Sequence, residues 1–286
     1  MQTSLSLGVS AFLVSVAFIG FDPENLAVGI SGATEGSAGI ALGSVIGAAM
    51  VAIGLAFGIT ALLRPMRFAQ APLGVIIVPL LALALFAALA ADGDLDRIDG
   101  ALLVGSYVAA VGYLYRLGRR GVDVRAEGSP AEEAEQRPRH PRVRSMGLLA
   151  LALAGIAVGS SVLVAASERV IAQVGISDPA FGLSILALAV SIEELARELP
   201  SAARGRADIT YGNVVGSVLA FFLFNAGVIA LVRPIAVPVE ALATPMLLVA
   251  VTLVVVTVSI SRRSVARWVG GVLLGLYVAF VRSLFA

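Results

Sequence analysis

The sequence predicts an all-α polytopic membrane protein with two inverted-topology repeats, and three observations support this fold class. Of its 286 residues, 59% are hydrophobic and only 14% are charged, whereas a soluble domain carries roughly a quarter charged residues. Nine apolar stretches approach the length of a bilayer span. A polar motif within the sixth stretch also has a weaker copy within the first.

The nine stretches lie on both sides of a polar segment, four before it and five after it. We treat the first stretch as a retained helix instead of a signal peptide, because residues 1–4 carry no basic side chain. The chain therefore divides into a first transmembrane repeat (1–117), a cytoplasmic linker (118–145) and a second transmembrane repeat (146–286). Prolines and a run of glutamates are typical of a flexible, solvated linker. The predicted spans are 5–32, 38–63, 72–91, 99–117, 146–166, 179–203, 208–232, 239–260 and 265–285.

Arginine placement predicts the orientation, because cytoplasmic loops carry an excess of basic residues and all twenty basic residues of this chain are arginines. Seven of them lie in residues 118–145, which puts this loop and the N-terminus in the cytoplasm. Counting spans puts the basic turns 64–67, 204–206 and 262–267 on the same side. The acidic link 92–99 then lies outside. The two halves run in opposite directions, which is a recurrent plan of secondary transporters.

The most informative stretch is 187–217, where the adjacent carboxylates Glu193 and Glu194 interrupt an apolar run. A charge at bilayer depth costs about 2.5 kcal/mol or more, so such residues usually line a pathway or bind an ion. We expect the helix to be broken or bent here, since non-helical backbone at that depth is tolerated where it lines a cavity. Small residues around this motif would let the helices pack closely. They are Gly43, Gly47, Gly212 and Gly216.

The first half repeats this pattern with Asp22 and Glu24, and we expect the helix of the first span to be broken or bent there as well. Glu24 precedes Glu194 by 170 residues, and Gly43 precedes Gly212 by 169. We interpret this as an internal repeat with a one-residue slip. Carboxylates converging from the two opposed halves, Glu24 and Glu194, would carry a charge of about −2, which balances one divalent or two monovalent cations. Competition between cations for the same carboxylates would couple their two fluxes.

Structural roles remain open for several of these residues. Arg197 follows Glu193 by four positions and Glu194 by three, so either carboxylate could form an ion pair within the helix. Asp22 precedes a proline and is equally suited to ending a helix. Asn213 could hydrogen-bond between helices instead of binding an ion.

Composition excludes other classes of function. The chain has no cysteine and a single histidine, His140, which excludes disulfides and thiolate metal sites and makes zinc hydrolysis implausible. The arginines lie in short loops between spans and do not indicate nucleic-acid binding. We expect no enzymatic activity, no cofactor, and a monomer whose partners are the lipid bilayer and the transported cations.

The motifs resemble a known family. The second signature repeat of the sodium/calcium exchanger family is similar to three segments of this chain, residues 191–196, 212–217 and 230–234. The first signature repeat of that family is similar to residues 43–47 and 61–65. The resemblance implies two inverted halves of five helices each. It also implies exchange of Ca²⁺ for Na⁺ or, in some branches, for protons, across the cell membrane.

Carried over by position, the resemblance implies that Glu194 is the ion-coordinating glutamate of the second repeat, with Ser191 and Ser217 as hydroxyl ligands. Glu24 is its expected counterpart as a metal ligand in the first repeat. Counting back from the glycines without gaps instead puts Asn25 at that position. The remaining ion-binding candidates in the two motifs are Asp22, Asn213 and Glu193.

The sequence also departs from the family pattern. Ligand positions of the family are occupied by residues without side-chain oxygen, so proton-coupled or other-cation exchange remains an alternative, as does a non-transporting scaffold or sensor. Residues 146–173 lack a counterpart in the first half, which implies either a start further upstream or the absence of a peripheral first helix. The substituted ligand positions are Ala48, Ala52, Val190 and Phe221.

Overall fold

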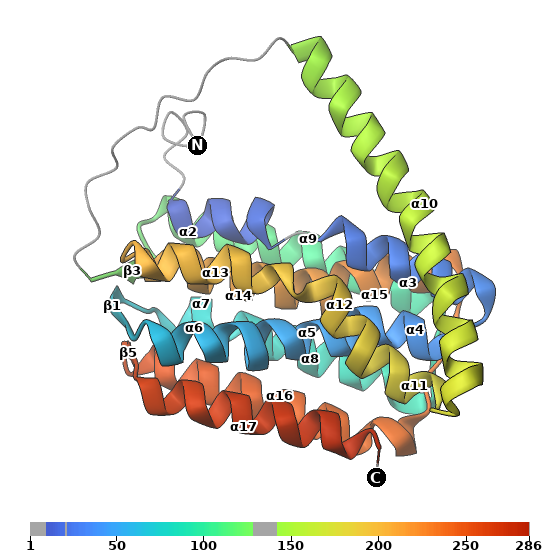
Figure 1. Cartoon of the computed structure of the whole chain (residues 1–286). Helices are drawn as coiled ribbons and strands as arrows, with labels where there is room; N and C mark the ends of the chain where they lie inside the picture. The colour runs from blue at the N-terminus through green and yellow to red at the C-terminus, as the bar shows by residue number, and fades with distance from the viewer. Residues whose placement is uncertain (1–9, 21, 128–141, 286) are drawn as a thin grey trace.

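A computed structural model describes residues 10–20, 22–127 and 142–285. Its helices lie side by side in one bundle, and α10 (Arg142–Val174) approaches the bundle at an angle and packs against α3 (Pro23–Glu35) with its C-terminal part (Figure 1). The predicted all-α architecture is confirmed. Residues 1–9, with which the first predicted span begins, and residues 128–141 of the predicted linker lie outside the described residues.

The first predicted span is a broken helix. α2 (Ala11–Val14) continues into a π-helical turn, η1 (Ser15–Ile19), and α3 begins anew at Pro23. Asp22 caps α3, because its Oδ1 accepts the backbone N–H groups of Glu24 (3.1 Å) and Asn25 (3.2 Å). Proline in the first turn suits a helix start, where its missing N–H costs nothing. The predicted break is confirmed, and Asp22 does act at a helix end.

The sixth predicted span is also broken. α11 (Asp178–Phe181), η5 (Gly182–Leu186) and α12 (Ala187–Ser191) form its first half, and α13 (Glu193–Ala203) forms its second half. The two halves meet at an angle of 49°. α3 and α13 both end before a glycine in the left-handed region, Gly36 and Gly205, whose backbone favours glycine. These glycines are 169 residues apart, the same offset as the repeat.

The remaining predicted spans are also helical. By length and hydropathy, six helices of the described chain can cross a membrane, or seven if the bent pair is one span. The last helix, α17, has 17 residues. The continuous spans Ala38–Leu63 and Ala207–Val232 contain α4 (Ala38–Leu42), η2 (Gly43–Gly47), α5 (Ala48–Met50), η3 (Val51–Ala56), α6 (Phe57–Leu63), α14 (Ala207–Leu219), η6 (Ala220–Asn225) and α15 (Ala226–Val232). The others are α7 (Leu73–Ile76), α8 (Val78–Leu89), η4 (Ala90–Asp92), α9 (Arg97–Arg119), α16 (Val239–Ser261) and α17 (Arg267–Ser283).

Short strands of one half pair with short strands of the other half. β1 (Met66–Gln70) pairs with β5 (Ser264–Val265), while β2 (Asp94–Leu95) pairs with β4 (Ile235–Ala236). In each pair, the strand that follows the long continuous span of one half, Ala38–Leu63 or Ala207–Val232, meets the strand that precedes the last helix of the other half. The basic turns 64–67 and 262–267 therefore lie together at one end of the bundle, and Gly205 of the third basic turn lines the same pocket as Arg67 and Arg267. The acidic link pairs with residues 235–236 at the opposite end.

One part of the predicted linker is folded. β3 (Arg125–Ala126) pairs with β1, and the buried carboxylate of Asp123 binds Arg125 Nε at 2.9 Å. The prediction of a flexible segment is wrong for these residues, because a free edge of β1 is available to pair with them. α10 already begins at Arg142, within the last residues assigned to the linker.

Glycines bring the helices of the two halves into backbone contact. A Cβ at Gly216 would lie 2.5 Å from the Val16 carbonyl oxygen and 3.0 Å from Gly20 Cα. Gly43 similarly faces the backbone of Gly182 in the opposite contact between the halves. The prediction that small residues permit close packing is confirmed. The contact at Gly216 places α14 beside the break of the first span.

Replacing Gly216 by alanine should destabilise the fold, because the added methyl group would overlap the backbone of η1. We expect a cost of about 1–3 kcal/mol, as for other overpacked positions. Thermal unfolding of the purified protein in detergent measures this. Gly271→Ala is the matched control, since its Cβ would meet no described atom within 4 Å. Equal unfolding midpoints for the two variants would contradict the close approach.

Candidate cation-binding site

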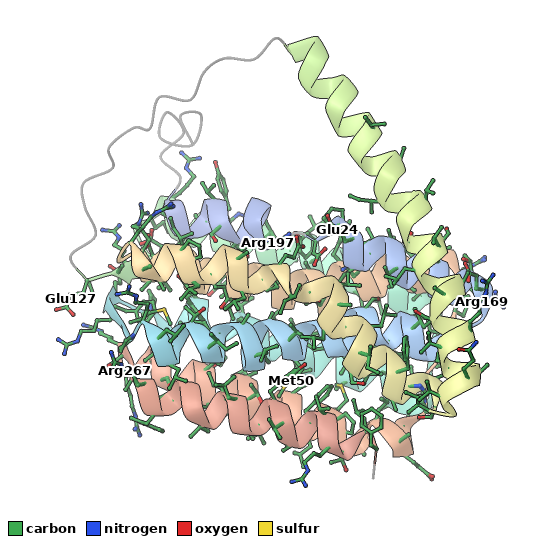
Figure 2. The ribbon with its side chains drawn as sticks, in the orientation of Figure 1. Glu24, Met50, Glu127, Arg169, Arg197 and Arg267 are labelled. Atoms are coloured by element: carbon green, nitrogen blue, oxygen red, sulfur yellow. The ribbon has the colours of Figure 1, made fainter. Side chains whose placement is uncertain are left out.

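The two helix breaks meet, and buried polar side chains line their contact. Figure 2 shows Glu24 and Arg197 midway along the bundle, with Glu127 and Arg267 at one end and Arg169 at the other. Six polar side chains near the breaks are at most 1% exposed, which is costly unless each has a partner. They come from α12 to α14 and from the start of α3. They are Asp22, Asn25, Ser191, Glu194, Asn213 and Ser217.

Asn25 joins the two halves through a single amide group. Its Nδ2 donates to Asp22 Oδ2 at 2.5 Å and to Ser191 Oγ at 3.0 Å. Its Oδ1 is buried and has no hydrogen-bond partner among the described residues. A buried carbonyl oxygen without a donor is a costly arrangement that a bound cation would relieve.

Glu194 is held by side chains of α14. Its Oε1 accepts a hydrogen bond from Ser217 Oγ at 3.0 Å, and its Oε2 accepts one from Asn213 Nδ2 at 2.6 Å. Arg197 Nη1 lies 3.5 Å from Oε1, and Arg197 Nη2 lies 2.7 Å from Glu193 Oε1. The ion pair expected between Glu193 and Arg197 is confirmed. The pair with Glu194 is the longer one, and the guanidinium group of Arg197 therefore lies beside both carboxylates.

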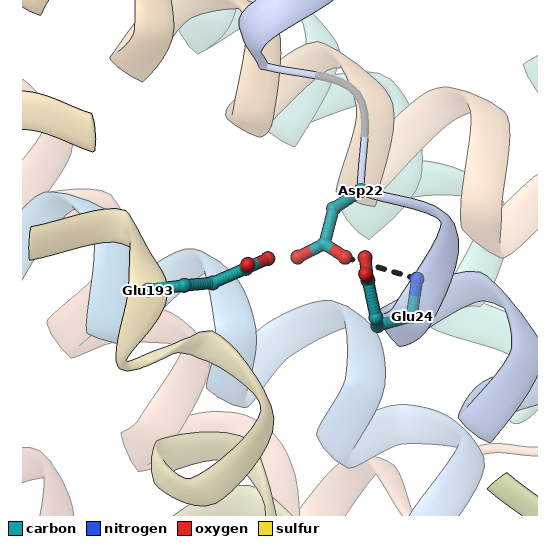
Figure 3. A group of neighbouring side chains, drawn as sticks. All are labelled: Asp22, Glu24 and Glu193. Carbon is teal, nitrogen blue, oxygen red and sulfur yellow. Dashed lines mark hydrogen bonds between the residues drawn. The ribbon is translucent and has the colours of Figure 1, made fainter. Parts of the chain in front are cut away.

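Glu24 lies in a second group of carboxylates. Oxygens of Asp22, Glu24 and Glu193 all lie within 4.8 Å of one another, and their side chains point toward a common centre (Figure 3). Glu24 and Glu193 are only half-buried. Like charges at this separation repel, so the group favours a cation or a shared proton.

Equivalent positions of the two halves are 169 residues apart in the structure, as Gly36 and Gly205 after α3 and α13 are. Asn25 therefore corresponds to Glu194, and Asp22 corresponds to Ser191, which Asn25 contacts directly. Glu24 corresponds to Glu193. Asp22 is the first-half carboxylate that Asn25 connects to the second broken helix, because the Asn25 amide donates to both Asp22 and Ser191.

Glu198 is a further carboxylate near this contact that was not predicted from the sequence. This residue is fully buried, and its Oε1 lies 3.4 Å from the Nδ2 of Asn213, which donates to it. Its Oε2 finds no partner in the described part of the chain. The spacing in the sequence could have indicated this residue, since Glu198 follows Glu194 by four residues and therefore lies on the same face of α13. With Glu198, five carboxylates occupy this region: Asp22, Glu24, Glu193, Glu194 and Glu198.

Apolar side chains occupy several ligand positions that the family resemblance points to. Ala48, Ala52 and Phe221 are all fully buried. Asn225 lies one helical turn after Phe221, and both atoms of its buried amide are unpartnered within the described residues. The oxygen ligands near Glu194 are therefore concentrated on the two broken helices and α14.

Comparison with known proteins identifies the family. Residues 2–116 and 144–286 match the family described as sodium/calcium exchanger protein. The chain belongs to the sodium/calcium exchanger family. It is therefore a multi-pass membrane protein and a cation antiporter of the exchanger type, and the family is one of transporters.

Individual relatives cover nearly the whole chain. The putative antiporter CaxA of Alkalimonas amylolytica is 27% identical over 300 residues, which cover 98% of this chain and 90% of that protein. The sodium/calcium exchanger MaX1 of Methanosarcina acetivorans is 26% identical over 321 residues, with the same two coverages. The solved structure of the sodium-calcium exchanger NCX_Mj matches with a TM-score of 0.70 and 22% identity over 98% of this chain and 89% of that one. That likeness confirms the exchanger fold.

Ser217→Ala should destabilise the protein, because Glu194 would lose one of the two neutral donors that hold its buried carboxylate. Losing a hydrogen bond to a buried charged group costs about 1.5–3 kcal/mol. Thermal unfolding in cation-free detergent solution measures the change. Ser44→Ala serves as control, since the Ser44 hydroxyl donates only to a backbone carbonyl of its own helix, at Ala41. A variant as stable as this control would show that Ser217 does not support Glu194.

Proposed function

We propose that this protein is a secondary active antiporter that exchanges Ca²⁺ for Na⁺ across the cell membrane by alternating access. The observation that carries the proposal is the buried contact between the two broken helices, where Asn25 joins Asp22 to Ser191 beside Glu194. Broken helices of two opposed halves are a common way for transporters to build a cation site. The transported cations are substrates of this site.

The charge and oxygen content of the contact suit a calcium ion. The carboxylates of Asp22 and Glu194 together offer a charge of about −2, which balances one Ca²⁺ or two Na⁺. Their oxygens, the carbonyl oxygen of Asn25 and the hydroxyls of Ser191 and Ser217 approach the roughly six to eight oxygens that Ca²⁺ takes. Cation binding would replace the hydrogen bonds that now hold these groups.

Alternating access would follow from the relation between the halves. Each half contributes one broken helix to the site, so a tilt of one half against the other would open the site to one side at a time. The arginine-rich end of the bundle is proposed to face the cytoplasm, together with the N-terminus and residues 118–145. The protein would need no cofactor and would act as a monomer in the bilayer.

Proton-coupled or other-cation exchange is the second candidate, and the apolar ligand positions favour it. Ala48, Ala52 and Phe221 cannot coordinate Na⁺ through a side chain, which leaves fewer oxygens for several ions at once. The carboxylates that meet at Asp22, Glu24 and Glu193 could instead carry protons. The acidity of the buried contact argues against a scaffold or sensor that has lost its site.

Vesicles containing the purified protein and loaded with Na⁺ should take up Ca²⁺, and Glu194→Gln should abolish this uptake. The change keeps the size of the side chain and removes the charge that would bind the ion. Uptake of ⁴⁵Ca²⁺ measures the exchange. Glu35→Gln is the matched control, because Glu35 is exposed at the end of α3 and should leave uptake unchanged.

Equal uptake by Glu194→Gln and the control would contradict the assigned site. Failure of every cation gradient, including a proton gradient, to drive uptake would contradict transport itself. Uptake driven by protons but not by Na⁺ would select the second candidate.

The first repeat supplies its own test, in which Asp22→Asn and Glu24→Gln are compared in the same assay. Asp22 is fully buried and bound to the bridging amide, whereas Glu24 is half-buried. We therefore expect Asp22→Asn to reduce uptake at least about tenfold more than Glu24→Gln, as when a charged contact worth about 1.4 kcal/mol or more is lost. The reverse order would assign the first carboxylate to Glu24.

A further inference from the structure

The fully buried Glu198 has no role in the proposed exchange site, yet a buried ionised carboxylate requires compensation. α13 carries it one turn beyond Glu194 and packs against both α14 and α6. Asn213 Nδ2 donates to Glu198 Oε1 at 3.4 Å, but Oε2 meets no donor among the residues that the structure describes.

The repeat indicates what surrounds Glu198. At an offset of 169 residues, its counterpart in the first half is Gly29. A Cβ at Gly29 would meet the side chains of Ile229, 3.2 Å away at Cγ1, and Ser44. The counterparts of Ile229 and Ser44 are Thr60 and Asn213. The pairing of helices agrees, because α3 packs against α15 as α13 packs against α6.

The two equivalent positions therefore differ in character. One half fills the space beside a glycine with the apolar side chain of Ile229. At the corresponding positions, the other half has the carboxylate of Glu198, the hydroxyl of Thr60 and the amide of Asn213. Thr60 is fully buried, and its Oγ1 is unpartnered within the described chain, as is the Oδ1 of Asn213. Unsatisfied buried oxygens on three different helices are rare in a folded protein and call for a ligand.

We infer that Glu198, Asn213 and Thr60 form a second cation site, which binds a monovalent cation of the Na⁺ class. One carboxylate supplies a single negative charge, which a monovalent cation neutralises and a divalent cation would exceed. The carbonyl oxygen of Asn213 and the hydroxyl oxygen of Thr60 are neutral ligands of the kind that alkali cations accept. Calcium sites recruit more oxygens and usually more carboxylates than this.

The second site would communicate with the central one through Asn213. The same amide nitrogen donates to Glu194 at 2.6 Å and to Glu198 at 3.4 Å. A cation that draws the oxygen of this amide toward Glu198 turns its nitrogen and weakens its bond to Glu194. This consequence rests on the proposed exchange function, whereas the presence of the second site does not.

Binding of ²²Na⁺ to the purified full-length protein in Ca²⁺-free detergent solution tests the site. We expect Glu198→Gln to bind one Na⁺ per chain fewer than the wild type. Thr60→Val keeps shape and charge, and should weaken the Glu198-dependent binding about tenfold or more through loss of one ligand to a charge. Ser44→Ala changes the counterpart of Asn213 in the first half and should bind Na⁺ as the wild type does.

Unchanged Na⁺ stoichiometry in Glu198→Gln would overturn the site, and so would unchanged Na⁺ affinity in Thr60→Val. If Glu198→Gln does not fold, Thr60→Val alone decides. The result is separable from the exchange function. Glu198-dependent Na⁺ binding without cation flux in vesicles would refute the antiporter and leave this site standing, whereas flux without such binding would refute the site alone.

Discussion

The structure depends on the cost of placing carboxylates within an apolar bundle. Glu194 and Asp22 are fully buried, and each would be strongly destabilising without hydrogen bonds or a counter-charge. Donors must therefore converge on them from several helices. Ser217 and Asn213 supply these donors to Glu194, and Asn25 supplies one to Asp22. The helix breaks serve the same need, because the start of α3 offers its free backbone N–H groups to Asp22.

Close approach of the two halves makes these short contacts possible. Hydrogen bonds between helices require backbones to lie nearer than large side chains permit. Gly216 and Gly20 meet this requirement beside one break, and Gly43 and Gly182 meet it on the equivalent contact. The exchanged strand pairs hold both ends of the bundle in the same symmetric relation. The polar contact is thus a product of the internal repeat.

Much of this arrangement could be predicted from the sequence. Long apolar runs identified the helices, and carboxylates within such runs identified the breaks, because both signals are local. The register of the first motif was harder. Chemical identity favoured Glu24 as the partner of Glu194, whereas spacing favoured Asn25, and in space the spacing holds since position along a helix sets side-chain direction.

Glu198 and β3 escaped prediction for a different reason. The burial of Glu198 depends on α14 and α6 covering that face of α13, which a single sequence does not reveal. β3 forms only because β1 offers it an edge from a distant part of the chain. Such tertiary effects override local composition, which for Arg125 and Ala126 indicated a solvated linker.

The most direct test of the central claim is to locate a bound divalent cation. Crystals of the protein soaked in Sr²⁺, a heavier analogue of Ca²⁺, would reveal the ion by its anomalous scattering. We predict a peak between the carboxylates of Asp22 and Glu194, within ligand distance of Asn25. A peak confined to Glu24 and Glu193, with none at Glu194, would contradict it.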